Sequence, residues 1–259
     1  MTDTELQLRE AIIAKCRWMN ATGLNQGTSG NISARHGNTM LISPSATPYD
    51  SLTPDMVAAM PIEGDYGSWT GPLKPSTEWR FHLDIMRARP DIGAIVHCHP
   101  PYGTALAMLN KPILAAHYMI ALFGGPIVEC VKYAPYGTKE LSDLAVAGLA
   151  DRHAVLLANH GAIATGATLE SAMHRAVELE ALARMYYLAI AVGRPAILSD
   201  EEIGRIVERF KTYGGGIDAQ KALAPVKKRA RAKAKATPAR RGAKKKAAGK
   251  KTRARPTRK

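Results

Sequence analysis

Short apolar, β-branched runs alternate with helical patterns along most of this chain, and few fold classes accommodate such an order. Runs typical of strands occur at 92–97, 113–117 and 154–158, and a strand pair with its turn near Gly37 is predicted within 31–45. Helical patterns are predicted around 6–16, from a cap at Ser76 or Thr77 to about 89, and over 138–149, 169–191 and 199–210. Short strands separated by helices predict an α/β or α+β domain.

The net charge of +14 is confined to the C-terminal tail. Residues 227–259 contain 17 Lys and Arg and no Asp or Glu, which leaves 19 basic against 22 acidic side chains, a net charge of −3, on residues 1–226. A Lys-, Arg- and Ala-rich segment cannot bury enough apolar surface to offset the entropy of ordering. We therefore predict one domain over 1–216 and a disordered basic tail over 217–259.

The sequence also indicates where in the cell the protein resides. No apolar run reaches the roughly 18 residues that a membrane span requires, and the first residues lack the basic and apolar regions of a secretory signal. The three cysteines are too few and too scattered to form a disulfide framework. These features predict a cytoplasmic protein without a membrane span.

Three histidines lie at or just after the ends of predicted strands. Because side chains alternate along a strand, His97 and His99 project to the same face and Cys98 to the other. A His-x-His pair alone is more often a hydrogen-bonded pair near a strand end than a metal site. His160 changes this balance, since it also follows a predicted strand and directly precedes a glycine. Three imidazoles at strand ends can bind Zn²⁺ and leave a coordination position for water or substrate.

Three further segments combine small and hydroxyl-bearing residues. Ser76 and Thr77 lie at a predicted helix start, where backbone N–H groups favour a phosphate dianion, and Glu78 could serve as a metal ligand or general base. Ordinary helix capping by Ser76 with an acid in the first turn accounts for the same residues. The glycine-rich loop 24–33 and the turn 43–46 suit close approach of a ligand, but either could be any loop.

In combination, these segments resemble the class II aldolase/adducin family, and within it most closely the zinc-dependent fuculose-1-phosphate aldolases. The resemblance covers roughly residues 5–215. It rests on the order and spacing of the stretches GLNQGTSGNIS, ISPSATPYDSLT, PSTEWRFH, IVHCHP, HYMIA, ANHGAI and LSDEEIGRIVERFKTYG. The implied fold is a three-layer α/β/α domain with a central mixed, largely antiparallel sheet. The implied assembly is a cyclic homotetramer with active sites at subunit interfaces.

The resemblance also implies roles for individual residues. His97, His99 and His160 match zinc ligands, although another divalent metal is possible, and Glu78 matches the residue that ligates the resting metal and then acts as base. The positions that match the sugar-phosphate pocket are Gly30, Asn31, Ser45, Ala46, Ser76 and Thr77. Tyr118 and Tyr213 match tyrosines that assist at the aldehyde end, and one of them can act in a neighbour's site. The family has glycine where Ala46 stands, and a Cβ would be penalised if this position requires a positive φ.

The function implied is reversible cleavage of a ketose 1-phosphate into dihydroxyacetone phosphate and an aldehyde by a metal-dependent aldolase. Fuculose 1-phosphate, 5-deoxypentulose and methylthioribulose phosphates are candidate substrates. One alternative is epimerisation, dehydration or decarboxylation on the same scaffold, although the family's epimerases carry Asp where Glu78 stands. A second alternative is that the protein is a non-catalytic, adducin-like interaction protein. The tail would contact nucleic acid or anionic surfaces non-specifically, or be a solvated segment without a role in catalysis.

Overall fold

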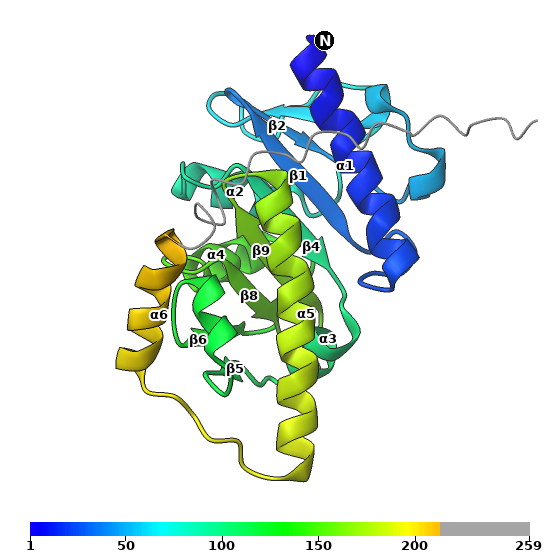
Figure 1. Ribbon diagram of the computed structural model, residues 1–259. Coiled ribbons are helices and arrows are strands. Elements are labelled where there is room, and N and C mark those ends of the chain that lie inside the picture. The colour runs from blue at the N-terminus through cyan, green and yellow to red at the C-terminus, as the bar shows by residue number, and fades with distance from the viewer. Residues whose placement is uncertain (213–259) are drawn as a thin grey trace, which may run out of the picture. The chain divides into compact units, whose positions relative to one another are not determined.

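A computed structural model describes residues 1–212, which form a domain with a seven-stranded sheet between two layers of helices (Figure 1). The strands are, in spatial order, β3 (Ala58–Pro61), β2 (Thr39–Ile42), β1 (Asn31–His36), β4 (Ala94–Cys98), β9 (Gly161–Gly166), β8 (Ala154–Leu157) and β7 (Cys130–Val131). The pairs from β3 to β8 are antiparallel, whereas β7 pairs with β8 in parallel. The predicted three-layer fold with a mixed, largely antiparallel sheet is confirmed.

The helices divide between the two faces of this sheet. They are α1 (Asp3–Thr22), α2 (Trp79–Ala88), α3 (Pro101–Met108), α4 (Lys139–Gly148), α5 (Leu169–Val192) and α6 (Asp200–Thr212). Helices α1, α3 and α5 cover one face and α2 and α4 the other, which is visible in Figure 1 from α5 lying over β4, β8 and β9. A separate two-stranded sheet pairs β5 (Ile113–Leu114) with β6 (Ile127–Val128).

Alternation along the central strand β4 assigns its side chains to the two cores. Val96 and Cys98 pack with α1 and α5, whereas Ile95 packs with α2 and α4. All five residues of β4 are buried, as expected for a strand covered on both faces. Burial of an apolar side chain of this size contributes roughly 1.5–3 kcal/mol. The strand that carries the first histidine is therefore held firmly from both sides.

Several predicted elements differ in extent from those observed. The run at 113–117 forms only the short strand β5, because a six-residue 3-10 helix follows at Tyr118–Phe123. Strand β9 was not predicted, because its alanine- and glycine-rich sequence carries no strong strand pattern. The predicted turn near Gly37 is confirmed between β1 and β2, where Gly37 has φ +59°.

The predicted boundary at 216/217 and the whole basic tail lie outside the described residues. Among residues 1–212, none of the helices combines the length and the apolar character that crossing a membrane demands.

Candidate functional site

The three histidines that follow predicted strands converge at one edge of the sheet. His97 is the fourth residue of β4, His99 directly follows that strand, and His160 ends the tight turn between β8 and β9. The three ring centroids are 4.9–5.0 Å apart. One potential ligand nitrogen from each ring lies within 4.8 Å of the others, a group that could hold one metal ion. The predicted convergence is confirmed.

Strand alternation sets the direction of His97. It shares the face of Ile95, and its ring contacts Phe81 of α2 edge-on, with a centroid distance of 5.5 Å. Its Nδ1 is 3.0 Å from the carbonyl oxygen of Ala162 in β9. When Nδ1 carries the hydrogen and donates to this carbonyl, Nε2 is left with a lone pair directed at the other two histidines. Cys98 points into the opposite core, as predicted.

Two close contacts hold His99 in place. A Cβ added at Gly161 would lie 2.6 Å from Cδ2 of His99 and 2.7 Å from the carbonyl oxygen of Cys98, so only glycine fits beside the His99 ring. The backbone N–H of His99 donates to Oδ1 of the buried Asn25 at 3.1 Å. Burial and the neighbouring imidazoles of His97 and His160 lower the pKa of His99 to about 4, so its ring is neutral near pH 7.

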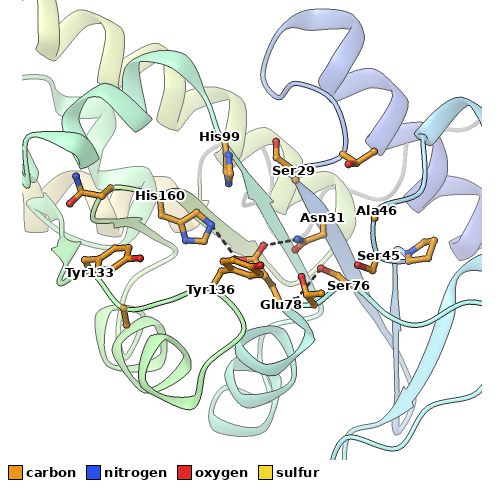
Figure 2. A pocket seen from close by; sticks show the side chains of 16 residues that line it. Ser29, Asn31, Ser45, Ala46, Ser76, Glu78, His99, Tyr133, Tyr136 and His160 are labelled. Carbon is orange, nitrogen blue, oxygen red and sulfur yellow. Dashed lines mark hydrogen bonds and ion pairs between the residues drawn. The ribbon is translucent and has the colours of Figure 1, made fainter.

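Glu78 faces the histidines from the residue just before α2. Its Oε2 is 3.2 Å from Nε2 of His97. The same oxygen accepts a 3.0 Å hydrogen bond from Nδ2 of Asn31 (Figure 2). Its Oε1 is 3.2 Å from Nε2 of His160 but receives no well-oriented hydrogen bond from the described residues. Burial alone would raise the pKa of this carboxyl, but His97 and His160 hold the pKa below its ordinary value. A carboxylate thus contacts two of the three clustered imidazoles.

Next to this cluster is an open pocket of about 380 Å³. In Figure 2, Ser45, Ala46 and Ser76 lie on one side of Glu78, and His160 lies on the other. The pocket is lined mainly by loops. It contains all six residues that the family resemblance assigned to a sugar-phosphate pocket: Gly30, Asn31, Ser45, Ala46, Ser76 and Thr77. A polar, hydroxyl-rich recess beside a potential metal site suits a small phosphorylated ligand.

Ala46 has a left-handed backbone conformation, with φ +50°. This is the conformation that the glycine of the family would adopt without strain, whereas in alanine the Cβ approaches the backbone. The side chain of Ala46 is exposed, and the loop keeps its place through a hydrogen bond from the Ser45 N–H to the carbonyl oxygen of Lys74. The alanine therefore leaves the loop closed, at a cost in backbone strain.

The predicted helix cap at Ser76 or Thr77 is wrong. Helix α2 begins at Trp79, and Glu78 occupies the capping position without a side-chain capping hydrogen bond. The Ser76 N–H is bonded to the carbonyl oxygen of Ser43, and the Ser76 carbonyl accepts from the N–H of Trp79, which makes a turn before the helix. Because Ser76 is held against the 43–46 turn, its hydroxyl is placed in the pocket and accepts from the Glu78 N–H at 3.2 Å.

The two tyrosines assigned to the aldehyde end do not line this pocket within the described residues. Tyr118 begins the 3-10 helix at Tyr118–Phe123 and is 49% exposed. Tyr213 lies outside the described residues. In their place, Tyr133 and Tyr136 from the loop between β7 and α4 reach the pocket and are 60% and 70% exposed (Figure 2). Sequence reasoning missed both, because neither belongs to a periodic pattern.

The chain is similar to known proteins over most of its length. The family described as "Class II Aldolase and Adducin N-terminal domain" matches residues 10–187, a range that contains the three histidines and Glu78. The chain belongs to this family.

Two of the similar relatives are named as aldolases. A protein of Rhodospirillum rubrum named 5-methylthioribulose-1-phosphate/5-deoxyribulose-1-phosphate aldolase is 46% identical over 214 residues, which cover 83% of this chain and 96% of the relative. The L-fuculose phosphate aldolase of Escherichia coli K12 is 45% identical over 209 residues, which cover 80% of this chain and 96% of the relative. A solved structure of an L-fuculose 1-phosphate aldolase superposes with a TM-score of 0.76 at 37% identity, covering 82% of this chain and 98% of that one.

Proposed function

We propose that this protein is a metal-dependent aldolase that reversibly cleaves a ketose 1-phosphate into dihydroxyacetone phosphate and an aldehyde. The observation that carries the proposal is the position of Glu78, a buried carboxylate that contacts two imidazoles of the three-histidine cluster at the wall of a hydroxyl-lined pocket. Relatives at 45–46% identity are named for cleavage of such substrates. Candidate substrates are L-fuculose 1-phosphate and the 5-deoxy and methylthio derivatives of ribulose 1-phosphate.

The proposed cofactor is Zn²⁺, or another divalent metal, bound by His97, His99 and His160. The donor set fits such an ion, because the three nitrogens lie within 4.8 Å of one another and Oε1 of Glu78 is buried without a well-oriented donor among the described residues. Three histidines with a fourth, exchangeable oxygen ligand are typical of a catalytic rather than a structural zinc site. When bound, the metal supplies Lewis-acid stabilisation of the negative charge that develops on the substrate oxygens.

Glu78 is proposed to move the proton. In the condensation direction its carboxylate would remove a proton from the carbon atom that attacks the aldehyde, and in cleavage it would return that proton. A base must be unprotonated before it can accept a proton, and the neighbouring imidazoles favour the charged, unprotonated form of Glu78. Asn31 holds one carboxylate oxygen, which leaves the other free to accept the proton.

The substrate phosphate is proposed to lie at the opposite end of the pocket from His160. Ser45, Ser76 and Thr77 would donate from their hydroxyls, with backbone N–H groups near Gly30 and Ala46 completing the cradle. Fixing the phosphate orients the bond to be cleaved beside Glu78 and the histidines. Asn31 lies between this cradle and Glu78 in Figure 2 and would contact the middle of the substrate.

Tyr118 and Tyr213 are proposed to act at the aldehyde end, where a phenol would protonate the aldehyde oxygen as the new bond forms. Since Tyr118 lies outside the pocket of its own chain, it would serve a neighbouring chain in a homotetramer.

We also propose a cytoplasmic location, a catalytic domain over 1–216, and a tail over 217–259 that contacts nucleic acid or anionic surfaces through its charge.

The test is product identification with the three candidate ketose phosphates. The protein should release a triose phosphate together with an aldehyde, whereas epimerisation would give an isomer of unchanged mass. Glu78→Gln should lower the rate by at least about 100-fold, because an amide cannot act as base, while the exposed Glu63→Gln control should keep the wild-type rate. If the metal-loaded protein forms no aldehyde from any of these substrates, the proposal is wrong.

A further inference from the structure

A fourth histidine lies behind the site, in the core. His82 occupies the first turn of α2, one turn after Glu78, and its side chain is fully buried. It is not part of the metal-ligand group and does not line the pocket. Its ring stacks on Phe81 with a centroid distance of 4.7 Å. Both ring nitrogens have partners on β1, with Nδ1 2.7 Å from Oγ of Ser33 and Nε2 2.5 Å from Oδ1 of Asn31.

The chemistry of the partners determines the direction of each hydrogen bond in this chain. The ionised carboxylate of Glu78 only accepts, so the Asn31 amide must present its Nδ2 donor to Oε2. The amide oxygen of Asn31 then faces Nε2 of His82, which must therefore carry the hydrogen. Burial lowers the pKa of His82 to about 3, so the ring is neutral and has a single N–H. Its Nδ1 consequently accepts from the hydroxyl of Ser33.

The result is a one-directional chain of donors from Ser33 through His82 and Asn31 to Glu78. Rotation of the Asn31 amide by 180° would turn its oxygen toward the carboxylate and its nitrogen toward Nε2 of His82. The hydrogen bond to Glu78 would then be lost, and the one to His82 would be kept only if the ring hydrogen moved from Nε2 to Nδ1. In a buried setting an unmade hydrogen bond to a charged group is costly. The N–H of His82 thus stabilises the same amide orientation that the Glu78 carboxylate requires.

We propose that His82 is a positioning residue that fixes the Asn31 amide and, through it, the orientation of the Glu78 carboxylate. The proposal rests on the function proposed for Glu78 and adds a residue to that site. His82 touches neither substrate nor metal in this arrangement. Its contribution is to keep Oε2 occupied by a donor, so that Oε1 is the oxygen that faces His160 and the pocket.

The simpler explanation is that His82 is a core residue whose polar atoms happen to be satisfied. Under that explanation its replacement would lower stability without affecting Glu78. The two explanations differ in whether a hydrogen-bond donor at the position of Nε2 is needed for normal kcat and Zn²⁺ affinity. Glutamine can place its amide nitrogen where Nε2 lies, asparagine is too short to reach Asn31, and phenylalanine fills the volume without a donor.

We expect His82→Gln to keep kcat within about three-fold of wild type, while His82→Asn and His82→Phe lower kcat by about 10- to 100-fold with little change in KM, the range seen when an outer partner of a metal site is removed. The affinity for Zn²⁺, measured by chelator competition, should follow the same order. Ile85→Val, a change to a buried apolar residue on the same helix, controls for lost stability and should leave kcat unchanged.

A double-mutant cycle tests whether His82 acts through Asn31. In an Asn31→Ala background, His82→Phe should cause little further loss of kcat or of Zn²⁺ affinity, because the amide that His82 orients is gone. Additive losses would contradict the proposal. The Zn²⁺ readout does not depend on the reaction, so a failure of the proposed aldolase function would leave this part of the test intact.

Nitrogen NMR of the histidine-labelled protein tests the chain of donors directly, even if the phenylalanine variant does not fold. The resonance of His82 is assigned by its loss in His82→Gln. The proposal requires a neutral ring with the hydrogen on Nε2 and a bare Nδ1. A hydrogen on Nδ1, or equal rates and Zn²⁺ affinities for the glutamine and asparagine variants, would overturn it.

Discussion

Oε1 of Glu78 lies 3.2 Å from Nε2 of His160, although one residue precedes helix α2 and the other ends the turn between β8 and β9. The contact brings the acid and one imidazole of the histidine cluster within reach of one ion. Loss of His160 should therefore remove a ligand and leave Glu78 without its nearest partner on that side.

We predict that His160→Ala lowers the affinity for Zn²⁺ by more than the roughly 10- to 100-fold seen when a supporting partner is lost, since a ligand itself is removed. Zinc content per chain after dialysis against a weak chelator measures this directly. The matched control is His174→Ala, a histidine exposed on α5. Equal zinc content in both variants would exclude His160 as a ligand.

A second prediction concerns acid stability. His82 has a pKa of about 3 in the folded protein against an ordinary 6.5, because burial disfavours its charged form. Between these values the unfolded chain binds a proton that the folded chain does not, so stability falls as the pH falls below about 6.5. The slope from this one group is up to about 1.4 kcal/mol per pH unit.

Urea unfolding of metal-free wild type and His82→Gln over pH 4–7 isolates this effect. Glutamine does not titrate, so the wild type should lose stability relative to the variant as the solution becomes more acidic. Parallel curves for the two proteins would show that His82 keeps an ordinary pKa when folded.

A third prediction concerns Ala46. Its φ of +50° is strained for alanine but not for glycine. Glycine also increases the entropy of the unfolded chain, which offsets part of the gain. We therefore expect Ala46→Gly to raise the free energy of unfolding by about 0.5 kcal/mol.

The control for Ala46→Gly is the exposed, helical Ala14, where the same substitution should instead cost about 1 kcal/mol. Both values come from urea titration. A loss at position 46 as large as that at position 14 would mean that the loop does not hold the left-handed conformation.

The tail supplies a fourth prediction. Truncation after Pro225 removes the 17 basic residues of 227–259. Turnover should stay within about two-fold, while weak binding of DNA, measured at low salt, should be lost together with its steep salt dependence. A large fall in turnover on truncation would show that the tail takes part in catalysis.

The convergence of His97, His99 and His160 was predictable in part from a simple rule. Side chains alternate along strands, which places His97 and His99 on one face. The direction of Cys98 followed from the same rule. That His160 joins them was expected from the family resemblance, because the residues alone do not give the direction of its strand. The family resemblance added the largely antiparallel pairing, which the pattern of residues alone left open.

Other features depend on tertiary contacts that no local pattern records. The cap at Ser76 was mispredicted because the Ser76 N–H bonds to Ser43 and delays the start of α2. Tyr133 and Tyr136 reach the pocket from a loop that follows a two-residue strand. The sequence does not single out His82, since its partners on β1 are about fifty positions away.

The central claim is that a metal held by three histidines is required for carbon–carbon cleavage beside Glu78. The most direct test strips the protein of metal with a chelator and titrates Zn²⁺ back while triose phosphate release from L-fuculose 1-phosphate and 5-deoxyribulose 1-phosphate is followed. The account predicts no release without metal and a linear rise to a plateau at one Zn²⁺ per chain. Full activity in the stripped protein, or none after one equivalent is bound, would contradict it.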